Sequence, residues 1–400
     1  METQDVVIIG GGIVGLATAW ALTEKTHFEL SVIEAEDHLA AHQSGHNSGV
    51  IHSGLYYRPG SEKAERCTTG REAMYRFCAE HGIAHERCGK IVIAVEDTEL
   101  PALAELEKRG RANGLMGIRR LTAEEIKSYE PCAGGIAALH VPDTGVVDYA
   151  EVSRMLGKLV RERGGQIELG RRFLGYRVDG PHGVLETNRG DIRTRFLINC
   201  GGLWADRIAR CCNVQPGATI VPFRGEYYQL VPARATLVRN LIYPVPDPRF
   251  PFLGVHFTRT IHGSIEAGPN AVLALARAGY SKTSFNVRDA WEMATNRGLW
   301  NLSAHYWQTG IEELWRSWSR RAFVKALQRL VPAVGVDDVL PAGAGVRAQA
   351  LSRTGRLLDD FHIVRAERMI HVINAPSPAA TASLSIGRTI AAMAADSLAR

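Results

Sequence analysis

The sequence lacks the features of several common protein classes. Its seven cysteines are an odd number and form no C-x-x-C pair, so neither a disulfide framework nor a metal site is expected. Cysteines used in this way fit a reducing compartment best. No apolar run approaches the roughly 18 residues that span a membrane, and no secretory segment is expected at the N-terminus. We therefore expect a cytoplasmic protein without spanning helices.

An excess of charge of one sign is also missing. The 47 Lys and Arg residues exceed the 42 Asp and Glu residues by only five in 400 positions. Because this excess is small, no nucleic-acid partner is expected unless the charge is clustered. The apolar share of 46% and the charged share of 22% are typical of an ordinary globular chain. At roughly 150 residues per domain, the length predicts two or three domains.

The N-terminus contains the most specific pattern in the chain. Residues 6–9 (VVII) predict a buried parallel strand, and residues 10–15 (GGGIVG) follow without a gap. An apolar helical pattern comes next, and a second strand at 30–33 (LSVI) ends in Glu34. Strand, glycine turn, helix, strand and acid in this order predict a dinucleotide-binding βαβ unit.

Each glycine of the turn has a physical role in such a unit. Gly10 allows the tight turn, Gly12 lets the backbone approach a pyrophosphate, and Gly15 lets the helix pack closely on the strand. The helix start at Ile13 and Val14 offers unpaired N–H groups to an anion.

Glu34 extends this prediction to the ribose. Its carboxylate can accept hydrogen bonds from a ribose diol and would repel a 2′-phosphate. A glycine-rich structural turn without a ligand is the alternative interpretation of the whole segment.

The segment 42–58 (HQSGHNSGVIHSGLYYR) is too polar for a core helix and too rich in imidazoles and phenols for a plain linker. It resembles the flavin-proximal loop of the D-amino-acid-oxidase-like FAD oxidoreductases, and HNSGVIHSGLYY in particular resembles the L-2-hydroxyglutarate dehydrogenase/oxidase family. The resemblance extends through PFRGEY, IYPVPDP, PFLGVH, GPNAVLA, AGVRAQ and NAPSPAAT. It implies FAD as cofactor, with loop residues Ser44, Asn47, Ser48, Gly49 and Val50 beside it.

The resemblance also implies how the chain is organised. We expect an α/β protein with a discontinuous Rossmann-like FAD-binding domain and an inserted α+β substrate domain on an antiparallel sheet. The FAD-binding domain is expected in residues 1–90, 140–215 and 335–400, and the substrate domain in 91–139 and 216–334. Alternating runs at 222–231 and 252–260 predict antiparallel strands, and 342–349 (AGAGVRAQ) is interpreted as glycine-rich turns.

Two later segments are expected to complete the flavin site. An apolar strand leads directly into Gly201 and Gly202, as another does into the first glycine turn. The resemblance implies that these glycines contact the nucleotide and that the strand of Phe173 lies over the adenine. Ser377 and Pro378 suit a helix start, where free N–H groups favour negative charge. The resemblance places the start formed by Ala379, Ala380 and Thr381 at the flavin N1–C2=O edge. A merely well-capped helix is the alternative.

Oxidation of a 2-hydroxy acid needs a base for the hydroxyl proton, a hydride acceptor and cations for the carboxylates. FAD N5 is the expected hydride acceptor. His52 in the flavin loop is the first candidate base, and His256 on an alternating strand is the competing one. The alternative for His52 is a hydrogen bond to flavin or backbone only.

Arginine matches a carboxylate bidentately, and the resemblance places Arg347 at the substrate α-carboxylate. A structural pair of Arg347 with Asp359 or Asp360 is the alternative. A second carboxylate needs a second clamp, for which we rank Arg259 and Arg224 first and Tyr227, Tyr228 and His256 after them. Tyr56 and Tyr57 are expected to line the pocket, or else to be strand-buried tyrosines.

The resemblance implies oxidation of L-2-hydroxyglutarate to 2-oxoglutarate, with quinone or O2 as electron acceptor. An amine or amino-acid oxidase, or a glycerol-3-phosphate dehydrogenase of the same superfamily, is the alternative, and a non-catalytic flavin-binding protein fits less well.

Five of the seven tryptophans fall between residues 291 and 318, followed by cations up to Arg329. This stretch predicts either a peripheral contact with the inner membrane or packing of helices on the substrate domain.

Overall fold

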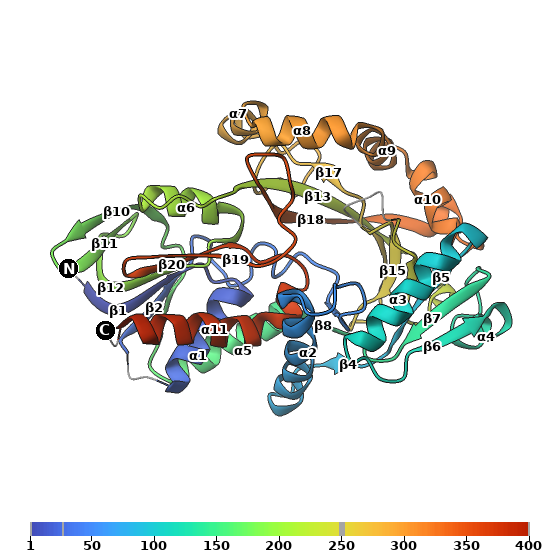
Figure 1. Cartoon of the computed structure of the whole chain (residues 1–400), viewed down its shortest axis with the longest axis horizontal. Helices are drawn as coiled ribbons and strands as arrows, with labels where there is room; N and C mark the ends of the chain where they lie inside the picture. The colour runs from blue at the N-terminus through green and yellow to red at the C-terminus, as the bar shows by residue number, and fades with distance from the viewer. Residues whose placement is uncertain (1, 26–27, 248–252, 399–400) are drawn as a thin grey trace.

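The computed structural model describes residues 2–25, 28–247 and 253–398. Two large sheets lie at the two ends of the long axis, and the helices of the N-terminal and C-terminal segments lie together beneath the first sheet (Figure 1). Within the described ranges, no helix is both long and apolar enough to cross a membrane.

The first sheet is the expected dinucleotide-binding sheet. Its pairing order is β10 (Phe173–Asp179), β11 (His182–Thr187), β12 (Ile192–Asn199), β1 (Glu2–Ile9), β2 (Leu30–Ile33) and β9 (Gln166–Glu168), with β20 (Met369–Asn374) on β12 and β19 (His362–Ala366) on β20. The central strands β12, β1, β2 and β9, together with β20, pair in parallel. The apolar run 6–9 fits this position because a central parallel strand is buried on both faces.

Helices cover both faces of this sheet. Helix α1 (Ile13–Lys25), α5 (Tyr149–Glu162) and α11 (Ala379–Leu398) pack together on one face, and α6 (Ala205–Cys211) packs on the other. A Cβ at Gly387 would lie 2.5 Å from the carbonyl carbon of Ala17, so α11 and α1 touch backbone to backbone. The last helix of the chain therefore closes the first βαβ unit.

The second sheet is mainly antiparallel. Its order is β17 (Val272–Leu273), β13 (Thr219–Leu230), β16 (Ile265–Gly268), β15 (His256–Arg259), β14 (Leu241–Pro244), β5 (Lys90–Ala94), β7 (Ala137–Val141) and β6 (Arg119–Thr122), with β18 (Val339–Leu351) on β13. The expected strand at 222–231 is confirmed within β13. The expected strand at 252–260 corresponds to β15, and its first residue, Phe252, lies outside the described residues.

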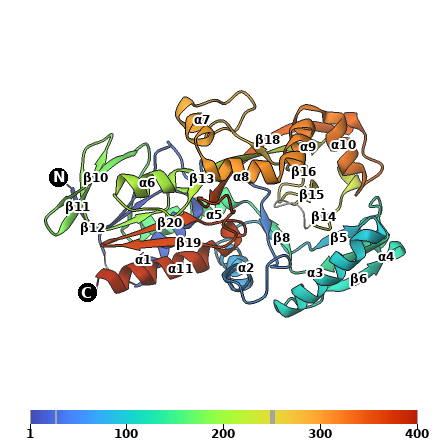
Figure 2. The same cartoon turned by 45° about the horizontal axis from the view of Figure 1, so that its top comes forward.

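Helices flank the second sheet at both ends. Helix α3 (Leu100–Ala112) and α4 (Ala123–Tyr129) lie near β5, β6 and β7, and α7 (Val287–Ala294), α8 (Arg297–His305), α9 (Trp307–Trp318) and α10 (Arg320–Gln328) follow one another along the other side (Figure 2). A small sheet of β3 (Val50–Ile51), β8 (Gly145–Val147) and β4 (His85–Glu86), with α2 (Glu62–Glu80), lies between the two halves (Figure 1). The predicted fold class, a Rossmann-like domain with an α+β substrate domain, is confirmed.

One detail of the expected organisation differs. The segment 342–349 forms part of β18, which pairs with β13 along its whole length, rather than glycine-rich turns. Gly345 is needed there because its Cβ would lie 2.5 Å from the carbonyl oxygen of His46 in the flavin loop. The expected FAD-domain piece 335–400 therefore begins with a strand of the second sheet, and the first sheet resumes only at β19.

Candidate functional site

A single elongated cavity of about 990 Å³ extends from the glycine turn of the first sheet to the surface of the second sheet. We call the part beside β1 and β2 the nucleotide end, and the part beside β13, β15 and β18 the far end.

The glycine turn at the nucleotide end has the expected close approaches. Gly10 adopts φ +112°, and a Cβ there would lie 2.5 Å from the carbonyl oxygen of Cys200. A Cβ at Gly15 would lie 2.1 Å from the carbonyl oxygen of Gly10, so Gly15 packs the helix on the turn and does not line the cavity. Gly12, Ile13 and Val14 do line it.

Glu34 lies at the end of β2 and lines the cavity although it is buried. Its carboxylate accepts hydrogen bonds from the backbone N–H of Gly11 (2.7 Å) and of Glu36 (2.9 Å). These two amides hold the carboxylate in place at the position expected for a ribose partner.

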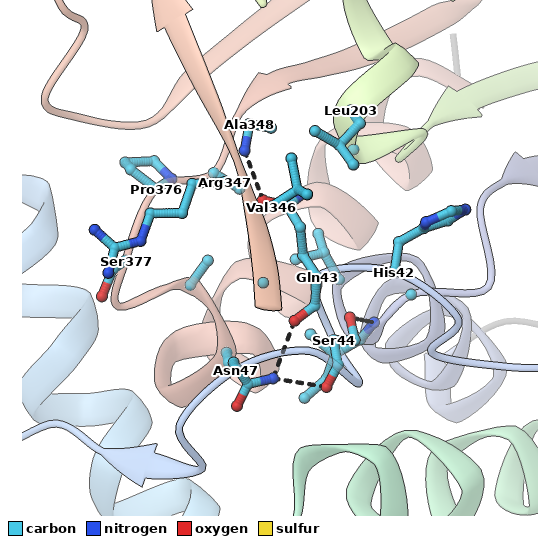
Figure 3. A pocket seen from close by; sticks show the side chains of 18 of the residues that line it. His42, Gln43, Ser44, Asn47, Leu203, Val346, Arg347, Ala348, Pro376 and Ser377 are labelled. Carbon is cyan, nitrogen blue, oxygen red and sulfur yellow. Dashed lines mark hydrogen bonds between the residues drawn. The ribbon is translucent and has the colours of Figure 1, made fainter. Parts of the chain in front are cut away.

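The flavin loop links both halves of the molecule. Ser44 Oγ accepts the N–H of Ile13 (2.9 Å) at the start of α1, and Gln43 Oε1 accepts the N–H of Ala348 (2.9 Å) on β18 (Figure 3). The Asn47 amide donates to the carbonyls of Gln43 and Ser44. Asn47, Ser48 and Val50 line the cavity, whereas Gly49, with φ +66°, serves a close approach to the carbonyl oxygen of Val147 instead.

The other segments expected at the cofactor also reach the cavity. Gly201 and Gly202, Phe173, and the helix start formed by Ala379, Ala380 and Thr381 all line it. The Thr381 hydroxyl accepts the backbone N–H of His52 (3.1 Å) and pairs with the Tyr149 hydroxyl (2.9 Å). The start of α11 is thus joined to the flavin loop.

Two imidazoles lie at the far end. His256 Nδ1 lies 2.9 Å from the carbonyl oxygen of Gly254, which makes Nδ1 the protonated nitrogen and leaves Nε2 with a lone pair. His52 Nε2 lies 3.5 Å from Ser377 Oγ, and His52 Nδ1 is buried without a hydrogen-bond partner. Burial lowers the pKa of each imidazole to about 3, and the charge of Lys90 acts in the same direction. Both side chains are therefore neutral proton acceptors near pH 7.

Arg347 extends from β18 into the cavity, where its side chain lies toward Ser377 (Figure 3). It forms a hydrogen bond with the half-buried Tyr227, and Tyr57 forms one with Ser377. Burial raises the pKa of both tyrosine hydroxyls, which therefore remain protonated. The structure thus brings His52, His256, Arg347, Tyr57 and Tyr227 to one end of the cavity.

Arg224 and Arg259 do not reach the cavity. Arg224 is buried against Glu226 (3.0 Å), and Arg259 pairs with Glu86 (2.6 Å). The alternation of side chains along a strand explains why Arg224 points away from the cavity. Neighbouring residues on β13 point to opposite faces of the sheet, and Tyr227 points to the cavity side. The expectation that these two arginines clamp the distal carboxylate is therefore not supported by their positions.

Sequence reasoning missed three residues near the far end. Tyr243 lines the cavity on β14, Arg109 lines it from α3, and Lys90 lies behind Tyr56 and Tyr243 at the start of β5. Lys90 could have been noticed, because it opens a strand whose other residues, IVIA, are all apolar and buried.

The fold and the glycine turn together define a dinucleotide-binding α/β protein with a second sheet over its ligand. The model of the family described as FAD dependent oxidoreductase matches residues 5–393. The chain is 48% identical to the L-2-hydroxyglutarate dehydrogenase of Indibacter alkaliphilus, covering 96% of this chain and 97% of that one. It is 43% identical to the mitochondrial human enzyme of that name (97% and 88% covered) and 41% identical to that of Escherichia coli (96% and 92%).

The chain belongs to the FAD dependent oxidoreductase family and, within it, to the family of the L-2-hydroxyglutarate dehydrogenases. It is an FAD-dependent enzyme, and the family resemblance of its sequence is confirmed. Among solved structures, the L-α-glycerophosphate oxidase of Mycoplasma pneumoniae with FAD bound superimposes with a TM-score of 0.81 at 21% identity, covering 100% of this chain and 96% of that one. Glycine oxidase of Geobacillus kaustophilus gives 0.75 at 16%, covering 99% and 95%. Both share the fold.

The residues present fit FAD. Gly10 and Gly12 line the cavity without side chains of their own, and the Glu34 carboxylate is fixed beside this turn by the N–H of Gly11 (2.7 Å). Residues at the starts of α1 and α11 line the cavity, and the start of a helix favours an anion or a polar ring edge. When bound, FAD supplies the acceptor for a hydride.

Proposed function

We propose that the protein oxidises L-2-hydroxyglutarate to 2-oxoglutarate. The observation that carries this proposal is the convergence of Arg347, His52 and His256 at the far end of a cavity whose other end is a dinucleotide site. The names of the relatives, at 41–48% identity over almost the whole chain, support the same substrate. Two electrons and one proton leave the α-carbon as a hydride to the cofactor, and the hydroxyl proton goes to a base.

The proposed roles follow from the chemistry of each side chain. Arg347 binds the α-carboxylate, since its planar guanidinium matches two oxygens. His52 takes the hydroxyl proton, and its buried, unpartnered Nδ1 supports an interaction with a ligand. His256 is the competing base, supported by the lone pair on its Nε2. Tyr57 and Tyr227 orient the substrate from the walls, and Tyr227 does so together with Arg347.

The proposed cofactor contacts divide among four segments. The turn at Gly10 and Gly12 with the helix start at Ile13 and Val14 holds the pyrophosphate, and Gly15 keeps that turn in place. Glu34 holds the ribose, and Phe173, Gly201 and Gly202 hold the adenosine side. The loop residues Ser44, Asn47, Ser48, Gly49 and Val50, together with Ala379, Ala380 and Thr381, surround the flavin.

An anaerobic titration of the purified flavoprotein tests the proposal. L- and D-2-hydroxyglutarate, malate, lactate, glycerol-3-phosphate, glycine and proline are added in turn, and the flavin absorbance is followed. Bleaching by L-2-hydroxyglutarate alone is expected. Bleaching by glycerol-3-phosphate or by an amino acid, with none by hydroxy acids, would replace this function with that of another member of the superfamily. No bleaching by any of them would favour a non-catalytic flavin-binding protein.

We further propose that electrons leave to quinone or O2 at a peripheral membrane position. The five tryptophans Trp291, Trp300, Trp307, Trp315 and Trp318 form what we call the tryptophan face. Each is at least 58% exposed, which argues against the alternative that they pack helices on the substrate domain. On α9, Trp307, Ile311, Leu314, Trp315 and Trp318 recur at helical spacing as one exposed apolar stripe. Such a stripe suits the interface of a bilayer.

The nearby cations contribute less than their number suggests. Arg316 pairs with Glu312 and Glu313, Arg320 with Asp337, and Arg329 with Glu96 and Glu99. Binding to lipid should therefore come mainly from tryptophan insertion, and salt should weaken it only slightly.

Vesicle flotation at low and at high salt tests the membrane contact. Wild-type protein is expected to float with anionic vesicles at both salt concentrations, and a Trp307→Ser/Trp315→Ser/Trp318→Ser variant is expected not to float. Failure of the wild type to float at low salt contradicts the proposal. A wild-type dimer that the triple variant abolishes in solution would assign this face to a second copy instead.

A further inference from the structure

Lys90 is the one buried cation among the described residues that has no carboxylate partner. The other four fully buried cations are paired: Arg71 with Glu72 and Asp143, Arg171 with Glu2 and Glu168, Arg224 with Glu226, and Arg277 with Asp206 and Glu292. Lys90 is only 2% exposed, and no ion pair or hydrogen bond of its ammonium group occurs in the described part of the chain. An unpaired buried charge is costly, so its presence calls for an explanation.

The ammonium group of Lys90 contacts two walls of the cavity. Its Nζ lies 4.2 Å from the ring centroid of Tyr56 and 4.9 Å from that of Tyr243, distances at which a cation is attracted to an aromatic face. Both rings line the far end, and Tyr243 packs against His256 with ring centroids 4.0 Å apart and the ring planes tilted by 33°. Lys90 is therefore separated from the cavity by the thickness of one aromatic ring.

The register of the second sheet explains this position. Tyr243 on β14 lies opposite Val92 on β5, so Lys90, two residues before Val92, points to the same face. The side chain of His256 on β15 packs against Tyr243 and therefore lies on that face as well. The sheet thus directs the lysine, the tyrosine and the histidine at one end of the cavity.

Negative charge is scarce at this end of the cavity. Of the four acids that line the cavity, Glu34 and Glu36 belong to the nucleotide end, and Glu105 lies 3.6 Å from Arg109. Asp359, the fourth, interacts electrostatically with Lys63, where its charge opposes the lowering of the lysine pKa by burial. A dianionic substrate brings two negative charges, and Arg347 accounts for one of them under the proposed function.

The structure also contains a free donor beside Lys90. The Tyr56 hydroxyl is buried and has no hydrogen-bond partner in the described structure, although Tyr56 lines the cavity. A phenol whose ring is in contact with a cation is a better hydrogen-bond donor to an anion, because the positive charge polarises the ring.

We propose that Lys90 is the second cationic group of the substrate site and makes it select an acid with two carboxylates over an acid with one, acting through Tyr56 and Tyr243. This rests on the proposed function, because the substrate assumed is a hydroxy acid with two carboxylates. Burial lowers the pKa of the Lys90 ammonium to about 7, so an arriving dianion would also favour its charged form. Lys90 is a positioning residue here, since it does not line the cavity and reaches the ligand only through the rings of Tyr56 and Tyr243.

The experiment compares Lys90→Met, which keeps the length of the side chain, with Lys90→Arg, which keeps the charge. Lys158→Met serves as control, because Lys158 is an exposed lysine on α5 that pairs with Glu162. Steady-state kinetics of each holoenzyme with a soluble dye acceptor are measured for L-2-hydroxyglutarate and for L-2-hydroxypentanoate, in which a methyl group replaces the distal carboxylate.

In Lys90→Met, kcat/KM for the diacid is expected to fall about tenfold or more, mainly through KM, while kcat/KM for the monoacid changes less than about threefold. Lys90→Arg is expected to recover most of the preference, and Lys158→Met to leave both substrates unchanged. Equal losses for both acids, or no loss for either, would overturn the proposal, because they indicate a structural role or none.

A binding measurement separates this inference from the proposed function. Glutarate and pentanoate, neither of which can be oxidised at a 2-hydroxyl, are titrated into wild type and Lys90→Met, and the flavin absorbance change is followed. Should the wild type fail to oxidise L-2-hydroxyglutarate, the proposed function falls. Lys90 would still be supported if glutarate affinity alone drops in the variant, and refuted if the two affinities change alike.

Discussion

The two ends of the cavity differ in the groups that form them. At the nucleotide end the glycine turn is packed so closely that a Cβ at Gly10 or Gly15 would lie within 2.5 Å of a carbonyl oxygen. At the far end the cavity is lined by side chains from the second sheet, among them His256, Tyr227 and Arg347, and by His52 and Tyr57 of the flavin loop. The turn therefore tolerates no side chain at these two glycines, whereas the chemistry of the far end depends on which side chains are present.

The largest effect is expected from Gly15→Val at the nucleotide end. The new side chain would begin 2.1 Å from the carbonyl oxygen of Gly10, which forces α1 away from the turn at a cost of about 3 kcal/mol or more. The purified variant should carry no flavin, as read from the ratio of flavin to protein absorbance. Gly310→Ala on α9 is the matched control, since nothing lies within 4 Å of its Cβ, and it should keep full flavin content.

The next largest effect is expected from His52→Ala at the far end. Loss of the base should lower kcat for L-2-hydroxyglutarate by about 10²-fold or more, with normal flavin content. His256→Ala, measured in parallel, should have the smaller effect on kcat. Nearly normal turnover in His52→Ala with a large loss in His256→Ala would move the base to His256.

A third prediction concerns stability and pH. Lys90 has a pKa of about 7 in the native state and about 10.5 when exposed, so between these values the unfolded state binds a proton that the native state does not. The free energy of unfolding should therefore rise with pH, by at most about 1.4 kcal/mol per unit. Buried cysteines such as Cys67, whose pKa burial raises, oppose this above about pH 9.

Urea titrations of wild type and Lys90→Met between pH 7 and pH 8.5 isolate this contribution. Lys90→Met is expected to have the larger free energy of unfolding near pH 7. This difference from the wild type should shrink as the pH rises, because neutral lysine is less costly to bury. A difference that does not change with pH would show that Lys90 has an ordinary pKa.

The smallest effect is expected from Arg259→Met. Arg259 is partly exposed and pairs with Glu86 outside the cavity, so its loss should cost no more than about 1 kcal/mol of stability. The KM for L-2-hydroxyglutarate should stay within about threefold of the wild-type value. A tenfold rise in this KM would indicate that Arg259 binds the substrate, and it would contradict the proposal that Lys90 is the second cationic group of the site.

The contrast between the two ends also explains what could be predicted from the sequence. The turn at residues 10–15 and Glu34 belong to one local unit, so their spacing alone predicts their arrangement. The far end depends on which strands pair and in which register, and a strand's neighbours are not visible in its own sequence. Arg224 and Arg259 were therefore expected in the cavity on the basis of charge, although the alternation of β13 turns Arg224 away.

The same limit applies to Lys90 and to Gln43, whose contacts with distant segments are visible only in the structure. From the sequence, Lys90 is interpreted as the polar first residue of an apolar strand. Only the pairing of β5 with β14 shows that it contacts Tyr243. From the sequence, Gln43 cannot be told apart from the other polar residues of its loop. The structure shows that its side-chain oxygen accepts the N–H of Ala348 on β18. Each depends on a contact between segments far apart in the chain.

The close contact of Gly387 with Ala17 has a consequence for synthesis. Helix α1 emerges from the ribosome early, yet the surface that covers it is α11, the last helix, and the parallel strand β20 also arrives late. Helix α5 can cover one side of α1 once residue 162 has been translated, but the side of α1 that faces α11 stays uncovered until residues 379–398 follow. A premature stop before residue 369 would leave a nascent chain that holds every glycine of the first turn and cannot close the pocket around it.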